Sequence, residues 1–261
     1  MVYLLVFVFG AIIGSFLNVC IYRIPIGKSI VWPRSCCIFC EEPIKWYDNV
    51  PLVSYVLLRG RCRSCSRPIP ARYFLVELVT ALSGVILLFY FSTPESLPTV
   101  PFFVYALLTC ILITVTVIDI EHQEIPDVIS IPGIFIGMIL FTVFRLDGSG
   151  KVTGSLINSS LGAVSGAGSM LILGVVGEWI FRKEALGGGD VKLMGMIGAF
   201  LGWKLALLTF FLAPISGSVV GIFMKLRFNR ETIPYGPYLA LGALVSLLYG
   251  KGILDYLFGG L

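Results

Sequence analysis

The spacing of the apolar segments constrains the fold of this chain more than any other feature of its sequence. Seven apolar runs are long enough to cross a lipid bilayer, near residues 2–22, 73–91, 101–119, 129–144, 156–181, 204–226 and 237–258. A shorter run, 191–202, lies between the fifth and the sixth of them. Only 13% of the residues are charged, about half the roughly 25% of soluble domains. The sequence therefore predicts an all-α polytopic membrane protein with about eight transmembrane helices.

Lysine and arginine are distributed unequally between the two sides of these predicted helices. Fifteen lie on one side, nine of them between residues 23 and 72, and four lie on the other. Since connections rich in these residues stay in the cytoplasm, the larger set is assigned there. Residues 1–24 lack the basic start and cleavage site of a signal peptide, so we expect a retained first helix with its N-terminus outside. The net charge of +4 reflects this topology and does not indicate nucleic-acid binding.

Four cysteines in the predicted cytoplasmic loop have the spacing of a metal site. Cys37-x2-Cys40 is followed, after 21 residues, by Cys62-x2-Cys65, and four thiolates are the ligand set of a structural Zn²⁺ site. Unrelated reduced thiols and redox chemistry are the alternatives, whereas disulfides are disfavoured in the cytoplasm. The neighbouring Cys36 does not give the two-residue spacing. We expect a small zinc-ribbon-like loop domain in which the metal stabilises the fold and leaves no open position for water.

Few carboxylates lie at membrane depth, where insertion scales assign a charge a penalty of about 2.5–3.5 kcal/mol. Glu178 precedes Arg182 by four residues, which is the spacing of an ion pair within a helix. Glu77 lies about one turn into the second helix, where it either reaches the interface or lines a pocket; both interpretations remain open. The other two candidates are Asp119 and Asp190.

Asp190 follows three glycines and opens the short apolar run. From Trp203, the expected anchor at the outer interface, back to Asp190 is about 13 residues, or roughly 20 Å of helix. Since the hydrocarbon core is roughly 30 Å thick, Asp190 should lie about 10 Å inside the cytoplasmic face. The preceding glycines would then enter the membrane as irregular backbone, which is tolerated only against protein or a wet cavity. We therefore expect a cytoplasm-facing wet pocket with Asp190 at its floor.

Asp119 ends the third long run, toward the same face, and is the expected partner of Asp190. Two carboxyl groups in one pocket can share a proton, so that one acts as general base on a water and the other as general acid toward a carbonyl. His122 is the single histidine, which argues against histidine-based metal or serine–histidine catalysis. A proton- or cation-coupled transporter is the alternative from another functional class, and a zinc-ribbon scaffold without chemistry is a third.

Glycines four residues apart recur in three of the predicted helices, as Gly10-x3-Gly14, Gly162-x3-Gly166 and Gly217-x3-Gly221. Such spacing lets helix backbones approach one another closely in membranes. We interpret all three pairs as packing surfaces.

Together these motifs resemble the bacterial type IV prepilin peptidases, which belong to the GxGD class of intramembrane aspartyl proteases. The resemblance covers nearly the whole chain. It includes GSFLNVCIYRIP (14–25), the cysteine-bearing loop, DIEHQEIPD (119–127), GGGDVKLMGMIGAFLGW (187–203) and PYGPYLALGAL (234–244). The double CxxC loop and the upstream aspartate motif make this pattern far more specific than a GxGD motif alone.

The resemblance implies that Asp119 and Asp190 are the catalytic aspartates, with Gly187 and Gly189 as the glycines of the GxGD motif. It implies cleavage of the short basic leader of prepilins and pseudopilins, the subunits of type IV pili and type II secretion systems, at the cytoplasmic face of the bacterial inner membrane. An intramembrane aspartyl protease that acts on other substrates, without methyltransferase activity, is the alternative within this class.

Members of this family that carry the cysteine domain also methylate the new N-terminus with S-adenosylmethionine. The sequence contains no glycine-rich methyl-donor motif, so no donor-binding residue is assigned. The expected domains are a first transmembrane helix (1–24), the cysteine-rich domain (25–72) and a polytopic peptidase domain (73–261) in contact with membrane lipid. The sequence carries no signal for an oligomeric state.

Overall fold

The computed structural model describes residues 1–92, 98–148, 150–182, 187–228 and 234–259. Within these ranges the regular structure is helical, and β-pairing is limited to two isolated bridges. Seven of the described helices are long and apolar enough to cross a membrane. An eighth, α7, has 14 residues. The predicted all-α membrane fold, including its short helix near residues 191–202, is therefore confirmed.

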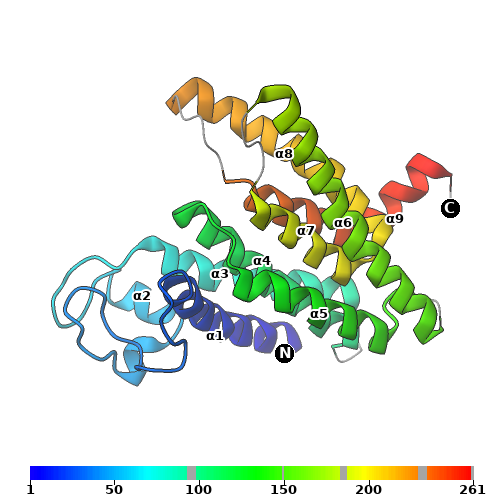
Figure 1. Cartoon of the computed structure of the whole chain (residues 1–261). Helices are drawn as coiled ribbons and strands as arrows, with labels where there is room; N and C mark the ends of the chain where they lie inside the picture. Colours follow the sequence, from blue (N-terminus) through cyan, green and yellow to red (C-terminus); the bar gives the residue numbers. More distant parts are fainter. Residues whose placement is uncertain (93–97, 149, 183–186, 229–233, 260–261) are drawn as a thin grey trace. The chain divides into compact units, whose positions relative to one another are not determined.

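The chain folds into two compact units, Met1–Thr114 and Val115–Leu261. The first contains α1 (Val2–Arg23), the short helices η1 (Trp46–Asn49) and α2 (Val53–Leu57), α3 (Ala71–Phe91) and most of α4 (Val100–His122). The second begins in the last turns of α4 and continues through α5 (Asp127–Phe144), α6 (Val152–Phe181), α7 (Gly188–Leu201), α8 (Trp203–Phe228) and α9 (Gly236–Phe258). Figure 1 shows these helices in order along the chain.

Helix α7 is the central element of the second unit. It packs against α5, α6, α8 and α9, and every residue from Leu193 to Leu201 is buried. Gly202, with a φ of +78°, then forms the turn into α8. Because protein rather than lipid surrounds α7, a helix too short to span the bilayer can be kept at membrane depth.

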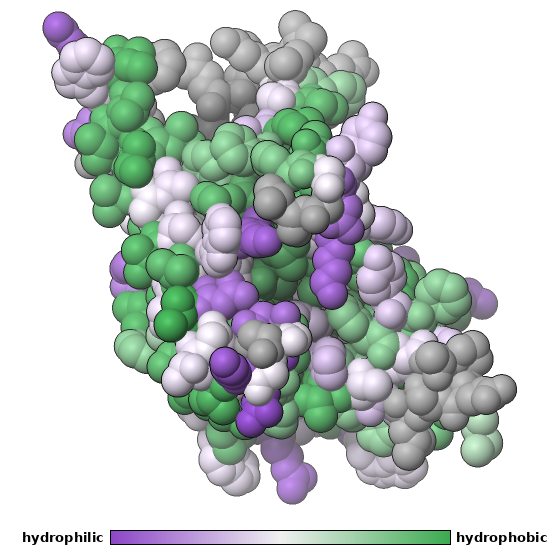
Figure 2. All heavy atoms as spheres, turned by 90° about the vertical axis from the view of Figure 1, so that its right-hand side faces the viewer, coloured by the Kyte–Doolittle hydropathy of each residue, from purple (hydrophilic) through white to green (hydrophobic). Residues whose placement is uncertain are grey.

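Large apolar side chains on the outer helices face away from the core, as expected for surfaces that contact lipid. Phe135, Val164 and Phe211, from three different helices, are each at least 60% exposed. In the space-filling view, apolar side chains cover much of the visible face, and polar side chains gather in smaller patches (Figure 2).

Close contact between α1 and α3 in the first unit depends on two glycines of α1. A Cβ atom on Gly10 would lie 2.8 Å from the Cα atom of Ala81, and one on Gly14 would lie 2.7 Å from that of Glu77. The backbones of the two helices therefore touch, as the Gly10-x3-Gly14 spacing predicted.

Two buried charges in the first unit bind the backbone of the cysteine loop, residues 25–72. The guanidinium of Arg23 donates hydrogen bonds to the carbonyl oxygens of Ser29 (2.9 Å) and Pro33 (2.7 Å). Glu77 Oε2 accepts a hydrogen bond of 2.8 Å from the backbone N–H of Leu52. Glu77 thus anchors the loop to α3, a contact that neither interpretation of its sequence position named.

The ion pair predicted between Glu178 and Arg182 is not present among the described contacts. Arg182 ends α6 in a left-handed conformation, and its backbone N–H donates to the Glu178 carbonyl oxygen at 2.8 Å. This change of direction in the backbone ends the helical geometry that the four-residue spacing requires.

In the second unit, Gly162 and Gly166 of α6 lie against the backbone of α7, at Gly198 and Met194 respectively. Gly217 differs from these packing glycines, because its nearest neighbours are the tyrosine rings of α9. The packing interpretation therefore holds for the α6 pair, whereas Gly217 faces side chains.

We expect the substitution Gly162→Ala to lower the melting temperature of the protein in detergent. The added Cβ would collide with the Gly198 carbonyl oxygen, and such overpacking destabilises by about 1–3 kcal/mol. Gly168→Ala in the same helix is the control, because a Cβ there meets no atom within 4 Å; it should leave stability unchanged or raise it by up to about 1 kcal/mol. Thermal unfolding followed by tryptophan fluorescence makes the comparison, and equal melting temperatures would contradict the packing described here.

Candidate functional site

Asp119 lies three residues before the end of α4, and only 5% of its surface is exposed. Its Oδ2 atom accepts a hydrogen bond of 2.8 Å from the backbone N–H of Gly236, which is 117 residues further along the chain. A buried polar group needs such a partner, since an unsatisfied one is strongly destabilising. The start of α9 therefore orients the carboxylate of Asp119.

Residue 236 must be a glycine for this contact. A Cβ atom at Gly236 would lie 2.8 Å from Asp119 Oδ2 and 3.3 Å from its Cγ. The next residue, Pro237, has no backbone N–H, so Gly236 supplies the donor at this helix start. The positive end of the α9 dipole also favours a negative charge at this position.

Asp190 lies in the first turn of α7, and its backbone N–H donates to the Gly187 carbonyl oxygen at 3.1 Å. Its side chain is partly buried, and Asp119 is close enough to act on it electrostatically. The structure thus brings together the two aspartates that the sequence singled out, both within the second compact unit.

The glycines before Asp190 do not form the irregular entry that the sequence suggested. Helix α7 already begins at Gly188, and Gly187 is its extended N-cap, with φ −73° and ψ 143°. None of the three glycines, Gly187, Gly188 or Gly189, has a positive φ. The expectation was therefore wrong for Gly188 and Gly189, because a helix N-terminus at this place needs no special backbone conformation.

Close approach, rather than backbone conformation, requires a glycine at residue 189. A Cβ atom on Gly189 would lie 2.9 Å from the Cβ atom of Ile125, in the segment between α4 and α5. At Gly187, by contrast, a Cβ would be in ordinary contact with Asp190 Oδ2, at 3.4 Å. Gly189 thus lets the aspartate-bearing turn of α7 pack against the segment that follows Asp119.

An ion pair holds the same two segments together. Lys192 Nζ lies 2.7 Å from both carboxylate oxygens of Asp127. Asp127 begins α5 and Lys192 lies in the first turns of α7. Both side chains are about half exposed, so the pair contributes at most about 1 kcal/mol. No local sequence pattern pairs Asp127 with Lys192, because the two residues are 65 positions apart in the chain.

Sequence reasoning also missed Gly236, which appeared only as part of the last resembling segment. The signal that could have identified it is the pair Gly236–Pro237 at the start of a predicted helix. Pro237 has no backbone N–H, and because Gly236 has no side chain, another group can approach the Gly236 N–H closely.

The four cysteines form a cluster that can bind a metal ion. The Sγ atoms of Cys37, Cys40, Cys62 and Cys65 all lie within 4.8 Å of one another, and those of Cys37 and Cys65 are 3.9 Å apart. Tetrahedral zinc with bonds of about 2.3 Å would place its sulfurs about 3.8 Å apart, so the donor set fits. Cys36 lies outside this cluster and forms one of the isolated bridges, with Pro43.

The two cysteine pairs have matching backbone geometry. The N–H of Cys37 donates to the Glu42 carbonyl oxygen, and the N–H of Cys62 donates to that of Arg67, at 3.0 and 2.9 Å. Glu41 and Ser66, each four residues after the first cysteine of its pair, have positive φ values of 56° and 57°. The loop therefore presents two equivalent knuckles to one central point.

Hydrogen bonds within the cluster favour thiolate formation at Cys37. Burial opposes ionisation there, but hydrogen bonds from the backbone of Cys40 and Phe39 outweigh it and lower the pKa of Cys37 to about 7.

Two arginines hold the loop together from outside. Arg63 makes a bidentate contact with Asp48, at 2.8 and 2.6 Å, and this hydrogen bonding lowers the pKa of the Asp48 carboxyl. Arg67 of one knuckle lies over the Phe39 ring of the other, at 5.2 Å.

Comparison with known proteins gives two family matches along the chain. Residues 8–91 match the Bacterial Peptidase A24 N-terminal domain, and residues 106–222 match the Type IV leader peptidase family. No solved structure matches.

Relatives named prepilin leader peptidase/N-methyltransferase are similar over nearly the full length of the chain. The protein of that name from Aeromonas hydrophila is 37% identical over 95% of this chain and 91% of its own. Those from Pseudomonas aeruginosa and Neisseria gonorrhoeae are 34% and 35% identical, over 94% and 91% of this chain and 89% and 87% of their own. The aspartate pair and the cysteine cluster thus occur in a chain that belongs to the type IV leader peptidase family.

Proposed function

We propose that this protein is an aspartic endopeptidase that cleaves the short basic leader from type IV prepilins and pseudopilins, and an N-methyltransferase that then modifies the new N-terminal residue. The observation that carries the proposal is the pairing of Asp119 and Asp190 in a chain of this family. Asp119 is buried and held by Gly236, whereas Asp190 lies at the partly exposed start of α7.

The two carboxyl groups divide the proton transfers of peptide hydrolysis. One, as a carboxylate, takes a proton from a water molecule whose oxygen attacks the scissile carbonyl carbon. The other, as a carboxylic acid, gives its proton to the carbonyl oxygen, and the tetrahedral intermediate collapses as the leaving amine is protonated. Because Gly236 occupies Asp119 Oδ2, Asp119 Oδ1 is the atom left for the water or the shared proton.

The cysteine cluster has the donor set of a structural zinc site. Cys37, Cys40, Cys62 and Cys65 would hold the ion in a closed site that stabilises the loop and takes no part in hydrolysis. S-adenosylmethionine, when bound, supplies the methyl group for N-methylation. No residue is assigned to its binding.

The lysine and arginine distribution supports an orientation in the bacterial inner membrane. The cysteine-rich domain (25–72) and both aspartates would face the cytoplasm, where a leader peptide is accessible. The first helix (1–24) and the polytopic domain (73–261) would contact lipid, and the latter would perform the cleavage.

We expect Asp119→Asn and Asp190→Asn each to reduce leader cleavage by at least about a thousandfold, because neither amide can exchange the proton. The assay is cleavage of a purified prepilin by the enzyme in detergent, with thermal unfolding to confirm that each variant folds. Asp127→Asn in the same motif is the control, since it loses only the exposed ion pair with Lys192 and should keep nearly full activity. Normal processing by either active-site variant would overturn the aspartyl mechanism, and ion flux into liposomes would then support a transporter.

Gly236→Ala should lower kcat by about 10- to 100-fold with a modest effect on stability. The new Cβ would force the Asp119 carboxylate away from its hydrogen bond, and displacements near 1 Å have effects of this size. Gly252→Ala in the same helix is the control, because a Cβ there meets nothing within 4 Å. Comparable kcat values for the two variants would show that the contact between Gly236 and Asp119 does not orient the catalytic group.

Elemental analysis of the purified protein should find about one equivalent of zinc, and Cys62→Ser should release it. Loss of the metal should make the cysteine loop sensitive to limited proteolysis. Cys36→Ser is the matched control and should retain the metal, because Cys36 lies outside the cluster. A wild-type protein without metal would refute the zinc assignment.

A further inference from the structure

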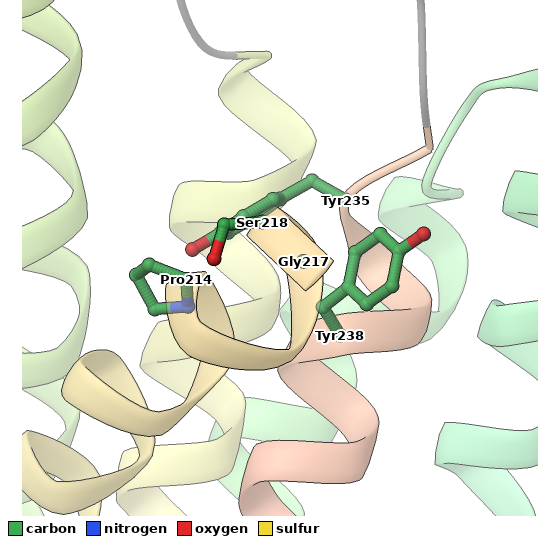
Figure 3. Close-up of a pocket in the computed structure, with 5 residues that line it drawn as sticks. All are labelled: Pro214, Gly217, Ser218, Tyr235 and Tyr238. Carbon is green, nitrogen blue, oxygen red and sulfur yellow. The ribbon is translucent and has the colours of Figure 1, made fainter. Parts of the chain in front are cut away.

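A recess beside the aspartate pair lies between α8 and the start of α9 (Figure 3). Its volume is about 260 Å³, and it is lined by Pro214, Gly217, Ser218, Tyr235 and Tyr238. Gly217 contributes no side chain and the Pro214 ring is short, so α8 leaves this space open. The recess has room for part of a bound peptide next to the tyrosines.

The hydroxyl group of Tyr235 is a buried polar group that has no hydrogen-bond partner within the described parts of the chain. Leaving such a group unsatisfied destabilises by about 1–3 kcal/mol, so each instance calls for an explanation. Figure 3 shows the hydroxyl groups of Tyr235 and Tyr238 pointing to opposite sides of Gly217. The two tyrosines therefore line the same recess with different orientations.

Tyr235 lies next to both aspartates. It directly precedes Gly236, whose N–H binds Asp119, and it is within electrostatic reach of Asp190. A peptide placed for cleavage by these aspartates would bring its backbone carbonyl groups past this hydroxyl. Away from bulk water each of those carbonyl oxygens needs a donor, and the Tyr235 hydroxyl can supply one.

We propose that Tyr235 is a substrate-binding group of the peptidase site, whose hydroxyl donates a hydrogen bond to a backbone carbonyl oxygen of the bound prepilin beside the scissile bond. The described part of the chain offers the Tyr235 hydroxyl no hydrogen-bond acceptor, and in this proposal the substrate supplies one. This inference rests on the proposed leader-peptidase function and adds to it the residue that positions the peptide backbone.

Tyr235→Phe tests the proposal because it removes the hydroxyl and keeps the ring. The KM for prepilin should rise about 3- to 10-fold, the effect of losing one neutral hydrogen bond to substrate, while kcat and its pH profile stay near wild type. Tyr256→Phe is the control and should change neither constant, because Tyr256 lies near the far end of α9 with 89% of its surface exposed. The melting temperature of Tyr235→Phe should not fall, because the hydroxyl loses no intramolecular partner.

Binding measured without turnover separates this inference from the function on which it rests. Wild-type cleavage together with an inactive Asp190→Asn variant would establish the peptidase independently of Tyr235. In the Asp190→Asn background, adding Tyr235→Phe should weaken prepilin binding by the same 3- to 10-fold factor. An unchanged KM and Kd, or a lower melting temperature of the variant, would overturn the proposal. So would a loss confined to kcat with a shifted pH profile, because the hydroxyl would then act through Asp190.

Discussion

The hydrogen bond from the Gly236 N–H to Asp119 determines the geometry on which the site depends. It joins the end of α4 to the start of α9 and satisfies a carboxylate that is almost fully buried. The bond exists because residue 236 has no side chain and because the following proline leaves Gly236 as the donor. One backbone group thus both stabilises a buried carboxylate and fixes its orientation.

Glycines allow close approach at two places in the second unit. In the packing of α6 on α7, Gly162 and Gly198 let two backbones touch, so that α7 is enclosed by protein. At the site, Gly189 lets the first turn of α7 reach Ile125, which brings Asp190 toward the segment after Asp119. Enclosure by protein explains how a helix of only 14 residues can be accommodated among longer apolar helices.

The cysteine loop is held by contacts of a different kind. Its two knuckles direct four sulfur atoms to one point, and membrane helices bind its backbone through the buried charges of Arg23 and Glu77. These charges lie at helix ends, where a loop backbone can satisfy them in place of water. The charged residues of the first unit therefore connect the loop to the helices.

The sequence alone was sufficient for the apolar helices, the short α7 and the choice of Cys37 over Cys36, because run length and residue spacing are local properties. The rarity of charge in apolar segments also singled out Asp119 and Asp190, whose catalytic role stays a prediction. The sequence did not identify Gly236 as the partner of Asp119, Leu52 as the partner of Glu77, or Lys192 as the partner of Asp127. It also assigned the wrong conformation to Gly188 and Gly189. Only the tertiary structure decided the three partners, because each depends on a contact between segments that are far apart in the chain, 117 residues for Asp119 and Gly236, and no local pattern encodes which group will meet a given side chain.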